Sequence, residues 1–555
     1  MQNSITERLT TLLREALDKA GLPAPEDIAW EVPREESHGD YATNSALTLA
    51  RAARKAPRQI ADAVKANFPH SPMVTRLEVA GPGFLNVFLA PEWCADALKG
   101  ILADGVTYGT GRAGQGKRFL LEFVSANPTG PLVIVNARAA AVGDALARIL
   151  RSQGYEVESQ FYVNDAGNQF QALAQSVDVR LRQALGETAE LPENSYPGEY
   201  LVDLVAKWLV ADPAGMRTLA ALPEAERVER LGRRAVSDMV VGQRAVLEAY
   251  GTRFDVWAHE DADVRQHGLP ERVIAELQAA GHTYVQDGAL WFRSTAFGDD
   301  KDRVLRKSDG ELTYFGVDIA FHHVGKFGRA DWVIDFLGPD HHGYVQRMKA
   351  AMVALGHPGD RYDALIVQLV TLLRDGQPVR MSKRRGEFVL MEELVEEVGR
   401  DAARFTFLTR RHDSPLDFDL AVATRQSADN PVFYVQYAHA RVSSLFRTAA
   451  EQDIVIPPWD QVDFRPLALP EEQTIIKRLL QYPSLVAGAA RAREPHRVAY
   501  YLTELAGLYH PYYKSRRVIT EDRALTLARL GLAAAVGQVV RNGLGLLGVS
   551  APESM

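Results

Sequence analysis

The sequence predicts an α/β protein in which a central domain is built on a doubly wound parallel sheet, with an N-terminal α+β domain before it and a C-terminal all-α domain after it. The first observation is a strand, loop, helix and strand in succession over residues 118–164, which is a βαβ unit. The second is that strand-like apolar runs return between residues 289 and 373. The third is helical periodicity from about residue 431 to the end. A sheet of this kind is Rossmann-like and binds ligands at the carboxyl ends of its strands.

Three domains are expected, because 555 residues exceed what one hydrophobic core supports. Residues 1–108 contain a leading amphipathic helix, an Ala/Arg-rich middle and an apolar strand preceded by the turn residues 81–83. Residues 109–425 form the central domain, and its segment from about 168 to 285 is predicted to be a helical insertion between two halves of the sheet. Residues 426–555 form the helical domain.

A glycine-rich stretch at residues 109–117 imitates a phosphate-binding loop. Such loops follow a strand and open a helix, whereas this one precedes a strand, and Arg118 occupies the position of the Ser or Thr that would coordinate magnesium. We therefore predict an interdomain linker there. Farther along, Asp309 and Gly310 predict a tight hairpin turn.

Composition excludes several classes of protein. No apolar run approaches the roughly 20 residues needed to cross a bilayer, and the N-terminus reads as an amphipathic helix without the apolar core of a signal peptide. The single cysteine, Cys94, excludes an internal disulfide and a cysteine-based zinc site. We therefore expect a cytoplasmic protein with no membrane partner and no structural metal. The net charge of −8 argues only weakly against nucleic acid, because local basic patches are enough to bind RNA.

Two separated segments carry the features of a nucleotide site. Residues 122–138 read EFVSANPTGPLVIVNAR, an apolar strand that breaks into a loop rich in Pro and Gly and then enters an Ala-rich helix. Backbone amides and a helix N-terminus at such a place bind phosphates. Residues 379–384 read VRMSKR, in which Lys383 is a mobile ammonium that can stabilise charge building on phosphates.

Together these segments resemble the two nucleotide-binding signatures of class I aminoacyl-tRNA synthetases, and the residues around them are similar to those of the arginyl-tRNA synthetase family. The resemblance spans essentially the whole chain. The tract HGDYATN at residues 38–44 resembles the family's additional N-terminal domain, and NPVFYVQYAHAR at 430–441 and GLGLLGVSAPESM at 543–555 resemble its anticodon-binding domain. The resemblance implies ATP-dependent attachment of L-arginine to its tRNA through an arginyl-adenylate, with release of AMP and pyrophosphate, and a need for bound tRNA before activation.

The resemblance also implies partners and residue roles. The partners are arginine tRNA, L-arginine and ATP, with Mg²⁺ arriving on ATP and keeping mostly water and phosphate ligands. We expect no tightly bound cofactor and a monomeric protein. The residues assigned to catalysis are Lys383, Asn136 and Arg384. Those assigned to ATP binding are Ser125, Pro131, Asn136, Arg138, Asp340, His341, Met381, Ser382 and Lys383.

One tetrapeptide departs from the family pattern. The family usually carries His-x-Gly-His at the start of the crossover helix, where this chain has Val133, Ile134, Val135 and Asn136. A valine side chain donates no hydrogen bond, although the Asn136 amide still can. The departure leaves two alternatives open: a repurposed paralogue that activates arginine for a non-tRNA acceptor, and a non-catalytic protein that binds tRNA or arginine.

Recognition of a guanidinium is best served by carboxylates, helped by an aromatic or amide wall. Tyr314 and Asp318 stand at i and i+4, on one face of a helical turn, and an isolated pair of this kind can also be a capping Asp beside a packing Tyr. By resemblance, these two residues together with Glu122 and Asn127 bind the amino acid.

The C-terminal segment interleaves aromatic and basic residues, a composition that suits unstacked RNA bases but also serves packing in helical bundles. The candidate tRNA contacts are Tyr434, Tyr437, Tyr509, Lys514 and the terminal Met555. The adjacent pair His341 and His342 does not suit one metal ion, and no metal ligands are assigned.

Overall fold

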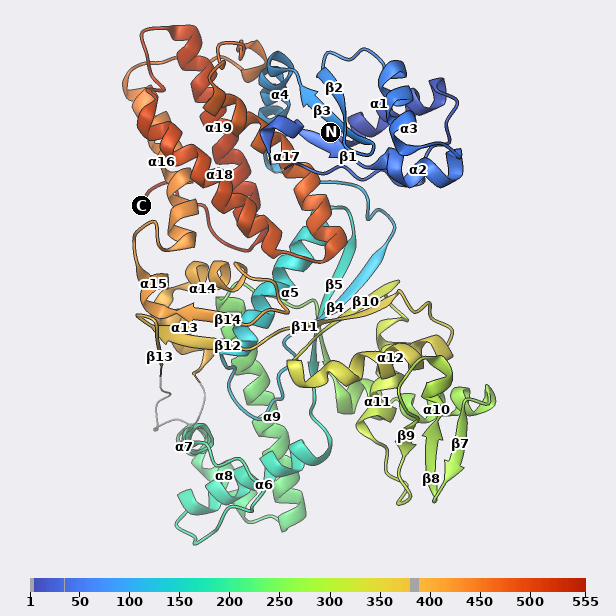
Figure 1. The fold of residues 1–555 in the computed structure, drawn as a ribbon. Helices are drawn as coiled ribbons and strands as arrows, with labels where there is room; N and C mark the ends of the chain where they lie inside the picture. Colours follow the sequence, from blue (N-terminus) through green and yellow to red (C-terminus); the bar gives the residue numbers. More distant parts are fainter. Residues whose placement is uncertain (1–3, 34, 380–388) are drawn as a thin grey trace.

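The computed structural model describes residues 4–33, 35–379 and 389–555. In Figure 1 the N-terminal domain lies beside the C-terminal helices at one end of the molecule, the main sheet occupies the middle, and two insertions form the opposite end. The N-terminal domain packs a three-stranded antiparallel sheet, ordered β1-β3-β2, against helices. Its elements are α1 (Ile5–Lys19), β1 (Tyr41–Thr43), α2 (Ser45–Ala53), α3 (Pro57–Asn67), β2 (Val74–Ala80), β3 (Phe84–Leu89) and α4 (Pro91–Asp104).

The central sheet has five strands in the order β11-β10-β4-β5-β6, and all four neighbouring pairs are parallel. The strands are β4 (Arg118–Glu122), β5 (Glu156–Val163), β6 (Val256–His259), β10 (Trp332–Leu337) and β11 (Tyr362–Ile366). The chain enters this sheet at its middle strand, β4, and adds β5 and then β6 on one side. It later returns to the other side of β4, where it adds β10 and then β11. The direction of winding therefore reverses between β4 and β10, and this switch point is where doubly wound sheets bind ligands.

The connections between these strands carry the helices of the domain. Helix α5 (Ile134–Ser152) joins β4 to β5, and α12 (His342–Ala354) joins β10 to β11. Four helices separate β5 from β6: α6 (Gly167–Ala184), α7 (Glu199–Ala211), α8 (Pro213–Ala220) and α9 (Glu224–Ala249). Between β6 and β10 lie α10 (Leu269–Ala279), the antiparallel strands β7 (Thr283–Gln286), β8 (Ala289–Phe292) and β9 (Arg303–Arg306), and α11 (Tyr314–Ala320).

The helical insertion ends earlier than the boundary near residue 285 that the sequence predicted. Its last helix stops at Ala249, and β6 then joins the edge of the main sheet beside β5. Strands β7, β8 and β9 pair with one another in a separate small sheet, whereas the later runs of β10 and β11 return to the main sheet. Strand-like sequence does not reveal which sheet a strand joins, because pairing depends on contacts between distant segments. The turn at Asp309 and Gly310 is present, with Gly310 at φ 89° and a bridge between Arg306 and Leu312.

The C-terminal part begins with a small sheet ordered β13-β12-β14 and ends in a helical bundle. The first elements are β12 (Val370–Arg374), β13 (Gln377–Pro378), α13 (Met391–Val398), α14 (Arg400–Phe407), β14 (Leu416–Asp419) and α15 (Leu420–Thr424). The bundle helices are α16 (Pro431–Glu451), α17 (Pro470–Ala492), α18 (His496–Ser515) and α19 (Arg523–Leu546). Among the described residues, α19 alone is long and apolar enough for a membrane span, and 67% of its apolar window is buried inside the protein, as in core helices.

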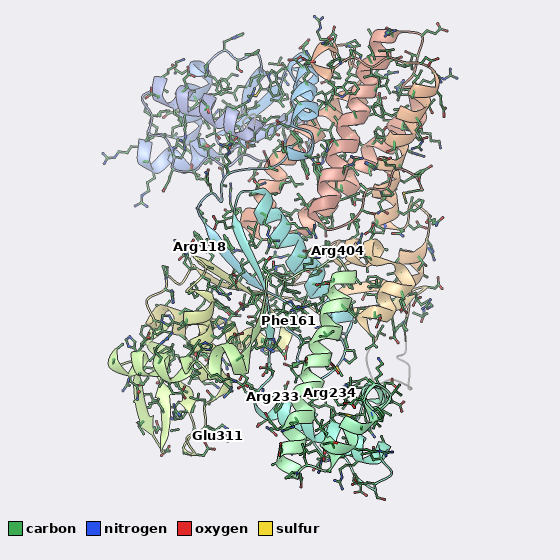
Figure 2. The ribbon with its side chains drawn as sticks, turned by 180° about the vertical axis from the view of Figure 1, so that it is seen from behind. Arg118, Phe161, Arg233, Arg234, Glu311 and Arg404 are labelled. Atoms are coloured by element: carbon green, nitrogen blue, oxygen red, sulfur yellow. The ribbon has the colours of Figure 1, made fainter. Side chains whose placement is uncertain are left out.

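Polar contacts join the domains. Asp40 of the N-terminal domain pairs with Lys477 of α17 at 2.7 Å, and Tyr108 donates to the carbonyl of Leu479 at 3.0 Å. The fully buried Arg404 of α14 binds both the Asp144 carboxylate of α5 and the carbonyl of Leu547 after α19, at the junction seen in Figure 2. The architecture confirms the predicted fold class.

Candidate active site

A row of polar residues crosses the switch point of the central sheet. The strand register places Asp335 of β10 beside Glu122 of β4, and Glu122 beside Gln160 of β5. Glu122 is the last residue of β4, and Asp335 and Gln160 lie level with it on the neighbouring strands; parallel sheets bind ligands beyond the carboxyl ends of their strands. Asp335 and Gln160 are buried, and the Glu122 side chain keeps 16% of its surface exposed. Glu122, the predicted contact for arginine, is therefore the open member of this row.

A buried ammonium lies against the row. Lys326 ends the π-helical turn Phe321–Lys326, which directly follows α11, and its Nζ lies 2.8 Å from Glu122 Oε2 and 2.7 Å from Asp335 Oδ1. Burial lowers the pKa of Lys326, but the carboxylates of Asp335, Glu122 and Asp318 raise it further, so the side chain stays charged. Sequence analysis missed this residue, because a single lysine in an apolar turn gives no local signal of burial.

Two more side chains anchor Asp335. His322 Nε2 lies 2.7 Å from Asp335 Oδ2, and the Tyr362 hydroxyl of β11 donates to the same oxygen at 2.9 Å. Burial raises the pKa of Asp335, but the charges of Lys326 and His322 outweigh that effect and hold it below the usual range. Asp335 is thus ionised and held from two elements, the π-helical turn and β11, and it fixes the position of the Lys326 ammonium.

The Tyr314 and Asp318 pair lies on α11, as the i, i+4 spacing predicted. Thr313 caps this helix by accepting a hydrogen bond from the Gly316 amide at 3.1 Å. Tyr314 is 55% exposed, and the Asp318 side chain is recessed with 32% of its surface exposed. Burial in this recess, with added repulsion from Glu122 and Asp335, raises the pKa of Asp318 to about 6, although His322 and Lys326 oppose the shift.

The loop after β4 is held in a strained but well-anchored shape. Val124 and Ser125 have φ values of 69° and 36°, which non-glycine residues rarely adopt. Ser125 Oγ accepts a hydrogen bond from the Tyr162 amide at 3.1 Å, and Gln243 of α9 donates to the carbonyl of Asn127 at 3.1 Å. The Asn127 side chain and Pro131 are exposed. The loop therefore presents these residues to solvent beside the carboxyl end of β4.

The start of α5 is bound to the residues that follow the lysine segment. Val133 forms an antiparallel bridge with Leu390, and the Ile134 amide donates to the carbonyl of Val389 at 3.1 Å. The Met391 amide in turn donates to the carbonyl of Leu132 at 2.9 Å. The predicted ATP and catalytic residues Met381, Ser382, Lys383 and Arg384 lie outside the described residues. The residues that follow them in sequence, 389–391, are hydrogen-bonded to residues 132–134, which belong to the first predicted nucleotide-binding segment.

The tetrapeptide that differs from the family pattern, residues 133–136, still forms the start of α5, and the Asn136 side chain bonds back to the residue before the helix. Asn136 Oδ1 accepts a hydrogen bond from the Val133 amide at 2.8 Å, so the amide oxygen is used by the helix and Nδ2 is the group that can donate to a ligand. Val133 and Val135 are half-buried. The turn and the helix start therefore form although this chain lacks the two histidines of the family's His-x-Gly-His.

Arg138 corrects one expectation. It was assigned to ATP, but it is fully buried, and its guanidinium donates to the carbonyls of Gln368, Leu369, Arg411 and Ser414 at 2.7–3.3 Å. Burial lowers the pKa of Arg138 to about 10. The side chain joins α5 to the loops around the small sheet, and we remove it from the proposed ATP contacts.

Asp340 and His341 follow β10 in a short 3-10 turn, Pro339–His341. His341 Nε2 lies 3.4 Å from Asp340 Oδ2, and both side chains are exposed. They follow a central strand, and their contact with the nucleotide stays a prediction. The described residues hold no group of three metal-ligating side chains close enough to bind an ion.

On the C-terminal bundle, α16 and α18 share an aromatic and basic cluster. Arg441 lies over the ring of Tyr437 at 4.4 Å and over that of Tyr513 at 5.1 Å, and it contacts His510 Nδ1 at 2.9 Å. Tyr437 is 36% exposed, Tyr434 is half-buried and Lys514 is exposed.

Two other candidate tRNA contacts differ in accessibility. Met555 is 52% exposed, whereas Tyr509 is fully buried, with its ring packed near Tyr512 and Tyr513. Tyr509 therefore serves packing, and we remove it from the proposed RNA contacts.

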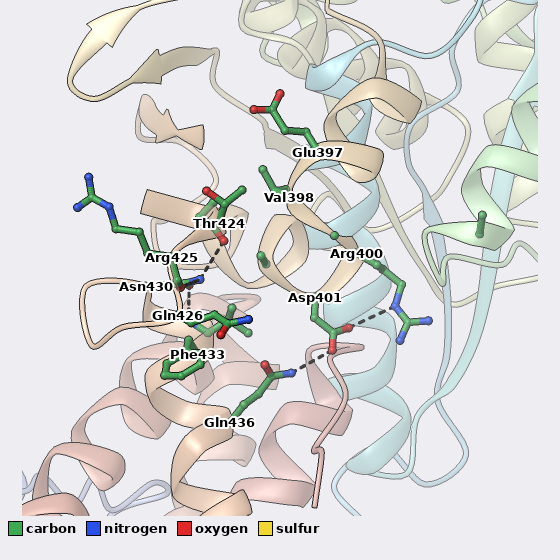
Figure 3. Close-up of a pocket in the computed structure, with 15 residues that line it drawn as sticks. Glu397, Val398, Arg400, Asp401, Thr424, Arg425, Gln426, Asn430, Phe433 and Gln436 are labelled. Atoms are coloured by element: carbon green, nitrogen blue, oxygen red, sulfur yellow. Dashed lines mark hydrogen bonds and ion pairs between the residues drawn. The ribbon is translucent and has the colours of Figure 1, made fainter. Parts of the chain in front are cut away.

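A large open pocket of about 540 Å³ lies elsewhere, between α14 and α16 (Figure 3). Its polar lining is tied to the protein: Gln436 donates to Asp401 at 3.0 Å, and Asn430 donates to the carbonyl of Ala423 at 2.9 Å. None of its lining residues belongs to the predicted site. Its size alone therefore assigns it no role.

Three family profiles match successive parts of the chain. Residues 7–89 match "Arginyl tRNA synthetase N terminal domain", residues 97–419 match "tRNA synthetases class I (R), catalytic domain", and residues 435–555 match "DALR anticodon binding domain".

Curated relatives and solved structures agree with these matches. An arginine–tRNA ligase of Symbiobacterium thermophilum is 46% identical over 100% of this chain and 99% of its own length, and one of Geobacter sp. strain M21 is 47% identical over 95% and 94%. The structure of Thermus thermophilus arginyl-tRNA synthetase superposes with a TM-score of 0.78 at 25% identity, covering 99% of this chain and 100% of that one. The chain therefore belongs to the arginyl-tRNA synthetase family of class I aminoacyl-tRNA synthetases.

Proposed function

We propose that the protein is an arginine–tRNA ligase, which uses ATP to form arginyl-adenylate, releases pyrophosphate, transfers arginine to the terminal adenosine of its tRNA and releases AMP. The observation that carries the proposal is the convergence at one switch point of an open carboxylate pair, Glu122 and Asp318, with a helix start bonded to the residues just after the Lys383 segment. The whole-chain match to arginine–tRNA ligases supports it.

We propose that Glu122 and Asp318 bind the guanidinium of arginine, with Tyr314 as a wall and Asn127 near the α-amino group. A planar guanidinium with five donors suits two carboxylates better than an ammonium does. Ser125, Pro131, Asn136, Asp340 and His341 are the proposed ATP contacts among the described residues. Met381, Ser382, Lys383 and Arg384 complete that set, with Mg²⁺ carried in on ATP. Positioning and charge stabilisation then supply most of the rate acceleration.

For the RNA we propose contacts through Tyr434, Tyr437, Lys514 and Met555 in a domain spanning residues 426–555, with residues 1–108 as a second tRNA-contacting domain and 109–425 as the catalytic domain. We also propose that the protein acts in the cytoplasm as a monomer. The aromatic and basic cluster around Arg441 supports RNA binding, because aromatic faces flanked by cations stack on unpaired bases.

The valines at 133 and 135 bear on how well the proposed reaction runs. Loss of one transition-state donor costs about 3 to 4 kcal/mol in a typical site. The described structure keeps the start of α5, where the Val133 and Ile134 amides are used within the protein and Asn136 Nδ2 remains as a donor. The whole-chain match to arginine–tRNA ligases supports the ligase over a repurposed paralogue or a non-catalytic binder.

The test is arginine-dependent exchange of pyrophosphate into ATP, with and without arginine tRNA, followed by transfer of arginine to that tRNA. Exchange and transfer together support the ligase. Exchange without transfer would show a different acceptor, and binding of arginine or tRNA without exchange would show a protein that has lost the chemistry.

A further inference from the structure

The side chain of Lys326 lies directly beneath the proposed arginine site, although nothing in the proposed reaction assigns it a role. It is 1% exposed, and its Nζ lies within 2.9 Å of three side-chain atoms: Glu122 Oε2, Asp335 Oδ1 and His322 Nε2. A buried ammonium is stable only when its charge is paired and its donors are used. The structure meets that condition by placing two carboxylates against one lysine.

Lys326 controls how the Glu122 carboxylate is presented. Glu122 Oε2 receives the Lys326 ammonium at 2.8 Å and the Gln160 amide at 3.3 Å. Gln160 is held in turn, because its Oε1 accepts a hydrogen bond from Arg329. With Oε2 occupied from two sides, Oε1 is the oxygen that can accept a hydrogen bond from a substrate.

Lys326 also sets the charge of the site. Three carboxylates gather here, those of Glu122, Asp318 and Asp335, and without a lysine they would repel one another. The Lys326 ammonium offsets the charge of the buried Asp335. The more exposed carboxylates, those of Glu122 and Asp318, are then the ones that face the substrate. The site therefore stays negative toward the substrate and attracts a cationic, planar side chain such as a guanidinium.

We propose that Lys326 is a positioning residue for the amino-acid substrate: it fixes the Glu122 carboxylate through Oε2 and keeps Asp318 available for the guanidinium. This inference rests on the proposed function, in which Glu122 and Asp318 bind arginine. Lys326 itself does not touch the substrate. Its own position is fixed by Asp335, which is held in turn by His322 of the same π-helical turn and by Tyr362 of β11.

The test compares Lys326→Met with Lys301→Met, a control at an exposed lysine outside the site. Exchange of pyrophosphate into ATP is measured with arginine tRNA present. For Lys326→Met we expect KM for arginine to rise at least about tenfold, the usual effect of losing a charged hydrogen bond, while KM for ATP changes less than about twofold. The control should match the wild type in both.

Two further readouts separate positioning from general damage. If Lys326 acts through Glu122, then at pH 8, where Asp318 is ionised, the double variant Lys326→Met with Glu122→Gln should be no weaker for arginine than Glu122→Gln alone. Lys326 also lowers the pKa of Asp318, so its removal should move the acidic limb of kcat/KM for arginine to higher pH. The other titratable groups that face Asp318 and its neighbours are His322, Asp335, Tyr362, Tyr162 and Glu260, and these stay unchanged in the variant.

Removing Lys326 leaves the buried Asp335 carboxylate without this cation, which can destabilise the fold. The double variant Lys326→Met with Asp335→Asn removes that charge as well and provides a second form of the test. A folded variant with unchanged KM for arginine would overturn the proposal, as would an equal loss for ATP and arginine. Failure of both forms to fold would assign Lys326 to stability alone and also overturn it. A wild-type protein without arginine-dependent exchange would instead refute the proposed function.

Discussion

The kcat/KM for arginine should depend on pH because the Asp318 carboxyl must be ionised to bind the substrate. The carboxyl has a pKa of about 6, raised mainly by burial in its recess, and only its ionised form attracts a guanidinium. The proton must therefore leave before arginine binds, so kcat/KM for arginine rises with pH through about 6. At pH 5 roughly a tenth of the carboxyl is ionised, which predicts a roughly tenfold lower kcat/KM than at pH 7.

The assay is initial-rate exchange of pyrophosphate into ATP from pH 5 to 8, with ATP and arginine tRNA saturating and arginine varied. Bound arginine favours the ionised carboxylate, so the limb in kcat should lie at lower pH than the limb in kcat/KM. ATP should show no matching limb in its own KM, because Asp318 does not contact it in the proposed site.

Asp318→Asn is the control that identifies the titrating group. The amide keeps the shape and removes the charge, so KM for arginine should rise about tenfold or more and the limb near pH 6 should vanish. His322, whose pKa is raised above its usual value, lies 3.7 Å from the carboxylate and is the alternative source of such a limb. A limb that persists in Asp318→Asn, or a kcat/KM that stays flat down to pH 5, would refute the reasoning.

Three further outcomes are expected. Lys383→Ala should slow exchange at least about tenfold, as expected for a charged transition-state contact, and an unchanged rate would remove Lys383 from the mechanism. Arg529→Met removes the cation that lies 2.8 Å from the buried Glu472, which keeps the neutral donors Tyr512 and the Leu469 amide. Urea unfolding of the full chain should therefore show a loss of about 3 to 5 kcal/mol, against less than about 1 kcal/mol for the exposed Arg465→Met. Tyr437→Ala should weaken tRNA binding in a filter-binding assay without changing KM for ATP, and equal tRNA affinity would exclude stacking by that ring.

The sequence determined the features that depend on neighbouring residues. The Pro- and Gly-rich loop between β4 and α5 predicted where the strand ends and the proposed phosphate-binding turn begins, because proline restricts the backbone locally and glycine permits tight turns. The spacing of Tyr314 and Asp318 placed both on α11, because a helix repeats about every four residues. The alternation of strands and helices predicted a parallel sheet, and a parallel sheet places the expected site at the carboxyl ends of its strands.

Only the tertiary structure decided which side chains are buried and what they meet. Arg138 and Tyr509 looked like ligand contacts in the sequence, yet both are fully buried, because helices and loops from distant parts of the chain cover them. Lys326 gave no signal at all, yet strands far apart in sequence bring Glu122 and Asp335 to its ammonium. Charge pairing in a protein interior depends on distances between such segments, and those distances are set by the packing of the whole sheet.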